Sequence, residues 1–191
     1  MWEFYYESRD IRDKKKHPAT YPISLARKCI ELFSHEGELV VDPFVGSGTT
    51  LVAARDANRN AVGFDLKHDY IRLCESRLQQ QSLMTRTQQL AVQADARHID
   101  QYLPDESISL LLTSPPYANL LNRKRKNKSR RGDLRDNGQL GQVEQYSQDP
   151  DDLGTLSLKE YQVVNLFSIT VPCYPGRQKS NRYSKVVPIV M

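Results

Sequence analysis

Two short segments of the sequence combine residue types suited to chemistry, and each follows an apolar run. The first, residues 42–50, reads DPFVGSGTT and places a Gly-x-Gly turn where a strand should pass into a helix. Glycines in such a turn let the backbone approach a ligand closely and direct N–H groups at it. The second, residues 113–117, reads TSPPY. Its prolines fix φ and restrict Ser114 to extended conformations, so a stiff turn holds the Ser114 hydroxyl and the tyrosine ring in set positions.

Three classes of ligand use a glycine turn between a strand and a helix. A phosphate-binding P-loop requires a lysine after its last glycine, and no lysine follows Gly48. A dinucleotide fold favours a third glycine where this chain has Leu51. Asp65, 17 residues after Gly48, ends the next apolar run and suits the ribose diol of an adenosine-containing cofactor. Each residue alone fits a ligand-free turn or a helix cap equally well, but together they favour such a cofactor.

The segments around these motifs alternate between helical and extended patterns. Ile23, Ala26, Ile30 and Phe33 recur at helical spacing, and further helices are predicted from residue 50 and through residues 71–78. Short apolar strands bounded by turns predict a parallel sheet covered on both faces, with the ligand beyond the carboxyl ends of its strands. The predicted strands are residues 38–42, 61–65, 90–94 and 109–113.

The positive charge of the chain is concentrated in one run. The 191 residues include 27 Lys and Arg against 23 Asp and Glu. Residues 123–131 read RKRKNKSRR, and without their seven basic side chains the rest of the chain has a net charge of −3. A local run of this kind fits either a polyanion contact or a solvated loop. Its basic residues are Arg123, Lys124, Arg125, Lys126, Lys128, Arg130 and Arg131.

Composition also argues against several classes of protein. Cys29, Cys74 and Cys173 share no short spacing, so neither a zinc site nor a disulfide scaffold is indicated. No apolar run approaches the ~18 residues of a membrane span, and the charged N-terminus does not resemble a signal peptide. We therefore expect a soluble cytoplasmic protein without a metal or a membrane partner.

Three motifs give the chain a resemblance to a known family. HPATYP at 17–22, DPFVGSGTT and TSPPY resemble the signatures of S-adenosylmethionine-dependent DNA amino-methyltransferases, over roughly residues 15–120. The resemblance implies an α/β fold with a Rossmann-like class I methyltransferase sheet, S-adenosyl-L-methionine as cofactor and DNA as partner. It also implies which residues contact the cofactor, with Asp65 at the ribose and Asp95 near the adenine. Those residues are Thr20, Tyr21, Asp42, Pro43, Phe44, Gly46, Ser47, Gly48, Thr49, Thr50, Asp65 and Asp95.

Asp95, Thr49 and Thr50 each have a second interpretation. An aspartate after a strand is usually a turn or cap residue, which weakens the adenine role of Asp95. Each threonine either caps the following helix or reaches the methionine carboxylate. These alternatives stay open at the level of sequence.

The TSPPY turn fits the chemistry of a nucleobase amine. The exocyclic amine of cytosine or adenine is a poor nucleophile, and acceptors beside its N–H bonds align it for displacement of a sulfonium methyl group. The resemblance implies that the Ser114 hydroxyl and the Pro115 carbonyl accept hydrogen bonds from the base amine. It also implies that Pro116 belongs to the same catalytic turn and that Tyr117 stacks on a flipped base. Serine in the first place is more typical of action on cytosine N4 than on adenine N6. A surface turn stiffened by proline is the alternative.

The C-terminal part departs from the family pattern. Residues 1–121 are predicted to form the cofactor-binding and catalytic core, 122–152 a basic polar loop that contacts DNA phosphates, and 153–191 a divergent tail. The family sheet has seven strands, so we expect a sheet that is incomplete on its C-terminal side. An RNA amino-methyltransferase and a non-catalytic fragment that binds cofactor or nucleic acid are the two alternatives.

Overall fold

The computed structural model describes residues 4–6, 8, 20–79, 86–116 and 185–188. The described helices and strands belong to one compact unit, which comprises residues 1–115 and 172–191. In chain order they are α2 (Ile23–Phe33), β1 (Leu39–Asp42), α3 (Thr49–Asp56), β2 (Asn60–Asp65), α4 (His68–Gln79), β3 (Gln89–Gln93), the 3-10 helix η1 (Ala96–Gln101), β4 (Leu110–Thr113) and β5 (Lys185–Pro188).

The five strands form one sheet in the order β3-β2-β1-β4-β5, and every neighbouring pair is parallel. The chain moves outward from β1 through β2 to β3 and then returns to the other side of β1 as β4. This reversal creates a switch point between β1 and β4, where ligands bind in open α/β sheets. The arrangement confirms the predicted Rossmann-like α/β fold, of which the described residues form part.

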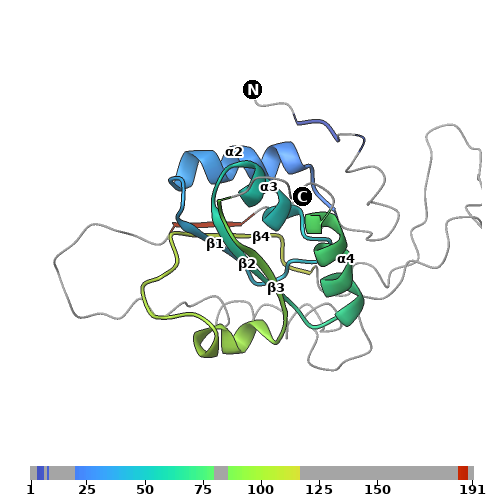
Figure 1. Cartoon of the computed structure of the whole chain (residues 1–191), viewed down its shortest axis with the longest axis vertical. Helices are drawn as coiled ribbons and strands as arrows, with labels where there is room; N and C mark the ends of the chain where they lie inside the picture. Colours follow the sequence, from blue (N-terminus) through green and yellow to red (C-terminus); the bar gives the residue numbers. More distant parts are fainter. Residues whose placement is uncertain (1–3, 7, 9–19, 80–85, 117–184, 189–191) are drawn as a thin grey trace, which may run out of the picture. The chain divides into compact units, whose positions relative to one another are not determined.

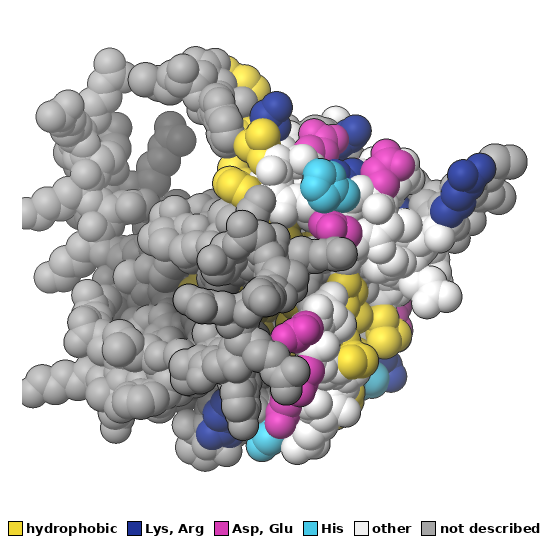
Figure 2. Space-filling model, turned by 90° about the vertical axis from the view of Figure 1, so that its left-hand side faces the viewer, with side chains coloured by type: hydrophobic (Ala, Val, Ile, Leu, Met, Phe, Trp, Pro, Cys, Tyr) yellow, Lys and Arg dark blue, Asp and Glu magenta, His cyan; other side chains and the backbone are white. Residues whose placement is uncertain are grey.

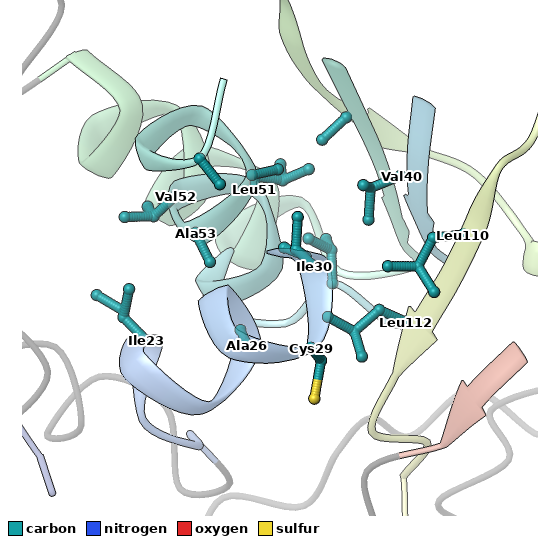
Figure 3. Close-up of a cluster of buried hydrophobic side chains, with 14 of the residues drawn as sticks. Ile23, Ala26, Cys29, Ile30, Val40, Leu51, Val52, Ala53, Leu110 and Leu112 are labelled. Carbon is teal, nitrogen blue, oxygen red and sulfur yellow. The ribbon is translucent and has the colours of Figure 1, made fainter. Parts of the chain in front are cut away.

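Helices α2, α3 and α4 pack on one face of the sheet, and η1 lies on the other side (Figure 1). The buried cluster between them contains Ile30 of α2, Leu51 of α3 and Val40, Leu110 and Leu112 of the strands (Figure 3). Burying one leucine side chain contributes about 1.5–3 kcal/mol. This core therefore fixes the helices on the sheet and, with them, the turns that follow the strands.

The opposite face carries its own aromatic contact. Phe64 of β2 is fully buried, and its ring meets the Tyr102 ring edge-on with a centroid distance of 5.6 Å. Because side chains alternate across a strand, Phe64 points away from the face that Ala61 presents to the helices. The sheet is thus covered on both faces in the described part of the chain, as predicted.

Strand β5 comes from the segment that we predicted as a divergent tail. Leu110 of β4 pairs with Lys185, and Thr113 pairs with Pro188. Pro188 ends the strand, where its missing N–H costs least. The tail therefore supplies an edge of the same sheet.

None of the described helices has the length and apolar character needed to cross a membrane.

Candidate cofactor-binding site

The loop after β1 is organised around the buried carboxylate of Asp42. Asp42 is 1% exposed, and its Oδ1 accepts a hydrogen bond of 3.0 Å from the Phe44 N–H. The Thr50 hydroxyl donates to Asp42 Oδ2, and the Tyr21 hydroxyl is bonded to that of Thr50. Since Thr50 has one hydroxyl proton, Tyr21 is the donor in that second bond. The chain Tyr21 to Thr50 to Asp42 joins the predicted 17–22 motif to the loop and to α3.

Burial shifts the pKa values of Tyr21 and Asp42 in this series of hydrogen bonds. Burial raises the pKa of Asp42 to about 6, against the opposing hydrogen bonds from Thr50 and Phe44. Burial also raises the pKa of Tyr21 well above its usual value, and the negative charge of Asp42 raises it further. Tyr21 therefore stays protonated at neutral pH and can donate to Thr50.

The glycine turn adopts a backbone that only glycine accepts easily. Gly46 has φ of 48° and Gly48 has φ of 81°, both in the left-handed region. A Cβ on Gly48 would lie 2.9 Å from Cys74 Sγ. The Val45 N–H donates to the Phe64 carbonyl at 2.8 Å, which ties the turn to β2.

Asp65 ends β2 next to this turn. Its Oδ2 accepts the Gly46 N–H at 3.0 Å, and its Oδ1 accepts the Lys67 N–H at 2.9 Å. Asp65 is half-buried, and a carboxylate oxygen can accept more than one hydrogen bond. Two adjacent acceptors at a strand end, beside a turn that contains two glycines, fit the ribose diol of S-adenosyl-L-methionine. Asp65 therefore acts in the turn before α4, and its acceptor capacity also suits the predicted ligand role.

The hydroxyl residues of the two motifs meet in one buried cluster. Thr20 Oγ1 donates to Ser47 Oγ at 3.5 Å, and the hydroxyls of Ser47 and Thr49 are 3.3 Å apart. Neither threonine caps α3, because the N-cap is Gly48 and no side chain bonds there. Thr50 is fully buried in the Asp42 network. Thr49 and Thr50 therefore make internal contacts and not the helix cap that was one of their two alternatives, and their contact with the cofactor stays a prediction.

Arg77 of α4 is a residue of this cluster that the sequence prediction missed. It is 4% exposed, and its Nη1 donates to the Ser47 carbonyl at 2.5 Å. The available signal was its position, three residues after Cys74 on the apolar stripe of the helix.

Asp95 follows β3 and is the N-cap of η1. Its Oδ1 accepts the Arg97 N–H at 2.8 Å, and its Oδ2 accepts from the Arg97 guanidinium at 2.8 Å and 2.5 Å. Burial alone would raise the pKa of Asp95, but the hydrogen bonds and charge of Arg97 hold it below the usual value. These contacts give Asp95 the cap role that we stated as the alternative to a contact near the adenine.

Ser114 directly follows β4, and it is half-buried together with Pro115 and Pro116. Because β4 lies beside β1 and parallel to it, this turn begins at the same edge of the sheet as Asp42. Tyr117 and the seven basic residues of 123–131 lie outside the described residues, as does the 17–19 part of the HPATYP motif.

Comparison with known proteins shows that the N-terminal region is similar to DNA methylases. Residues 1–76 match a family model described as DNA methylase. The chain is 43% identical over 67 residues to the type II methyltransferase M.MthZI of Methanothermobacter thermautotrophicus, which is 35% of this chain and 19% of the relative. It is 37% identical over 78 residues to M.HpaI of Haemophilus parainfluenzae, which is 41% of this chain and 25% of the relative. The chain thus spans about a quarter or less of these two relatives.

Solved structures overlap with about half of the chain. TrmN of Thermus thermophilus is 25% identical with a TM-score of 0.47 over 56% of this chain and 32% of its own. An rRNA methylase of Streptococcus thermophilus is 14% identical with a TM-score of 0.42 over 50% of this chain and 55% of its own. The curated sequence matches and the geometry around Asp42 and Asp65 therefore agree that residues 1–76 are similar to S-adenosylmethionine-dependent DNA amino-methyltransferases.

Proposed function

We propose that this chain, alone or as part of a longer protein, transfers a methyl group from S-adenosyl-L-methionine to an exocyclic amine of DNA. The observation that carries the proposal is the parallel pairing of β1 with β4, with Val41 opposite Leu111. This pairing supports one cleft for the loop after β1 and the Ser114 turn, because both follow strand ends at the switch point.

The residues of the chain divide the work between binding and alignment. When bound, S-adenosyl-L-methionine supplies an electrophilic methyl group on a sulfonium sulfur. Asp65 accepts the ribose hydroxyls, and the glycine turn allows backbone to approach the ligand. The Ser114 hydroxyl and the Pro115 carbonyl accept the two N–H groups of the amine. They would align the amine lone pair for transfer, in which the S–CH3 bond breaks, S-adenosylhomocysteine leaves and the amine loses one proton. Positioning is therefore the main contribution of the protein.

Cytosine N4 is the favoured acceptor in this proposal, because serine stands in the first place of the SPPY turn. Adenine N6 is the competing acceptor. Mass analysis of nucleosides from DNA of cells that express the protein separates the two, since N4-methylcytosine and N6-methyladenine differ in mass and retention. Neither modified base above background would contradict the proposed activity.

The seven basic residues of 123–131 are proposed to contact DNA phosphates. The described surface in Figure 2 shows acidic, basic and histidine side chains intermixed, without a continuous basic patch among the described residues drawn there. Phosphate contacts release counterions, so replacing all seven residues by serine should flatten the salt dependence of DNA binding. An unchanged slope would reject this contact.

A second candidate function is cofactor binding without turnover by this chain alone. It is favoured by the short span of the match, which covers 19% of M.MthZI. Cofactor binding without transfer to DNA or RNA, even after addition of a longer C-terminal region, would support it. Tritium transfer from labelled cofactor, compared between DNA and RNA, also tests the nucleic-acid class.

A further inference from the structure

Arg77 of helix α4 is a buried cation that contacts the loop after β1, which we call the cofactor loop. Arg77 Nη1 donates to the Ser47 carbonyl at 2.5 Å, to Ser47 Oγ at 3.2 Å and to Thr49 Oγ1 at 3.3 Å. One guanidinium nitrogen thus meets both the backbone and the side chains of the turn. Because Arg77 is 4% exposed, these contacts are shielded from water and are stronger than surface contacts.

Cys74 contacts the same turn from one helical turn earlier in α4. Its Sγ donates to the Gly46 carbonyl at 3.2 Å. Its Cα and Sγ occupy the space next to Gly48, at 3.2 Å and 2.9 Å from where a Cβ would stand. Three consecutive positions of the turn, 46 to 48, therefore rest on α4.

These contacts set the direction of the peptide groups. In a trans peptide the carbonyl of one residue and the N–H of the next point in opposite directions. Since the Gly46 carbonyl points at Cys74, the Ser47 N–H points away from α4. The same helix begins at His68, and Asp65 Oδ1 accepts the N–H of Lys67, the residue just before the helix. Helix α4 thus contacts the turn, and the residue that leads into the helix holds the carboxylate.

We propose that Arg77 is a positioning residue for the cofactor site, and that it acts by holding the backbone of residues 46–49 in the ligand-binding conformation. This inference rests on the proposed cofactor role of the turn. Arg77 acts through the turn and does not itself contact the ligand. Without its guanidinium, the Ser47 carbonyl and two hydroxyls lose a common donor, and the turn samples other conformations.

Arg59 provides a matched control. It is 8% exposed and also bonds to backbone carbonyls, donating to Ser34 O at 2.7 Å and to Ala57 O. It directly precedes β2, so it lies at the amino ends of the strands, away from the turn. Arg59→Met removes a comparable buried cation and comparable bonds without touching the cofactor loop.

The test measures binding of S-adenosylhomocysteine by calorimetry to the full chain and its variants, together with thermal unfolding. Arg77→Met is expected to raise Kd about tenfold or more, because small displacements of a binding group are costly. Arg77→Lys should recover part of this loss, and Arg59→Met should lower stability while Kd stays within about twofold. An unchanged Kd in Arg77→Met, or an equal loss in Arg59→Met, would overturn the proposal.

Amide hydrogen exchange without ligand separates this proposal from the cofactor assignment. Exchange of the peptide that contains residues 46–49 should accelerate in Arg77→Met and not in Arg59→Met. If the unmodified chain binds no S-adenosylhomocysteine, the cofactor assignment fails, while the exchange comparison still decides the role of Arg77. If Arg77→Met does not fold, Arg77→Lys and Arg77→Gln enter the same comparisons and the same outcomes decide.

Discussion

The Gly46 N–H donates to Asp65 Oδ2 at 3.0 Å, although the two residues are 19 positions apart. This bond joins the turn after β1 to the end of β2. The proposed ribose acceptor and the glycine turn are therefore one structural unit. A change in either residue is expected to disturb the other.

Gly48→Ala tests the contact between the turn and α4. An added Cβ would lie 2.9 Å from Cys74 Sγ in a backbone with φ of 81°. Gly37→Ala is the matched control, because Gly37 has φ of 80° and nothing within 4 Å of its Cβ position. Both variants carry the backbone penalty, and we expect Gly48→Ala to lose about 1–3 kcal/mol more from overpacking. Urea unfolding measures the difference, and equal losses would contradict the contact.

Asp42→Asn tests the buried carboxylate through its pH dependence. The pKa of Asp42 in the folded chain is about 6, above its ordinary value of 3.8. Its folded state therefore binds the proton more tightly, so its contribution to stability is present at low pH and is lost as pH rises through about 6. The free energy of unfolding of the unmodified chain, minus that of Asp42→Asn, should fall between about pH 4 and pH 7.

Asp95→Asn is the control with the opposite sign. Arg97 holds the pKa of Asp95 below the usual value, so its contribution is present above the ordinary pKa and is lost as pH falls through the lowered one. The burial argument is wrong if the difference in unfolding free energy between the unmodified chain and Asp42→Asn does not change with pH. It is also wrong if that difference changes in the direction expected for Asp95.

Ser114→Ala separates binding from transfer. The hydroxyl is proposed to align the base amine and not to bind the cofactor. We expect methyl transfer to DNA to fall about a hundredfold while the Kd of S-adenosylhomocysteine is unchanged. Ser107→Ala is the control, because Ser107 is also half-buried but precedes β4, where its Oγ donates to Pro104 O at 2.7 Å. Full activity in Ser114→Ala would remove the assigned role.

Local patterns predicted most of the elements to within a residue or two. The predicted strand 61–65 is β2 (Asn60–Asp65), and the helical spacing that ends at Phe33 is α2 (Ile23–Phe33). Strand β5 escaped prediction because it pairs with β4 across more than 70 residues of chain, and Pro188 obscured its pattern.

The side-chain partners in the site depend on tertiary contacts and escaped local reasoning. The sequence placed Asp42 and Thr50 in one motif but gave no sign that the hydroxyl donates to the carboxylate. Arg77 lies 30 residues from Ser47, and only the packing of α4 against the turn brings them together. The sequence pattern predicts where a ligand would bind, whereas the packing determines which residues hold that segment in place.

The most direct test of the central claim is calorimetric titration of S-adenosylhomocysteine into the chain, into Asp65→Ala and into Asp69→Ala. Asp69 is an exposed acid in the first turn of α4 and serves as the control for lost charge. The account predicts saturable binding to a single site, unchanged in Asp69→Ala and weakened about tenfold or more in Asp65→Ala. Absence of saturable heat in the unmodified chain, or equal affinity in Asp65→Ala, would contradict it.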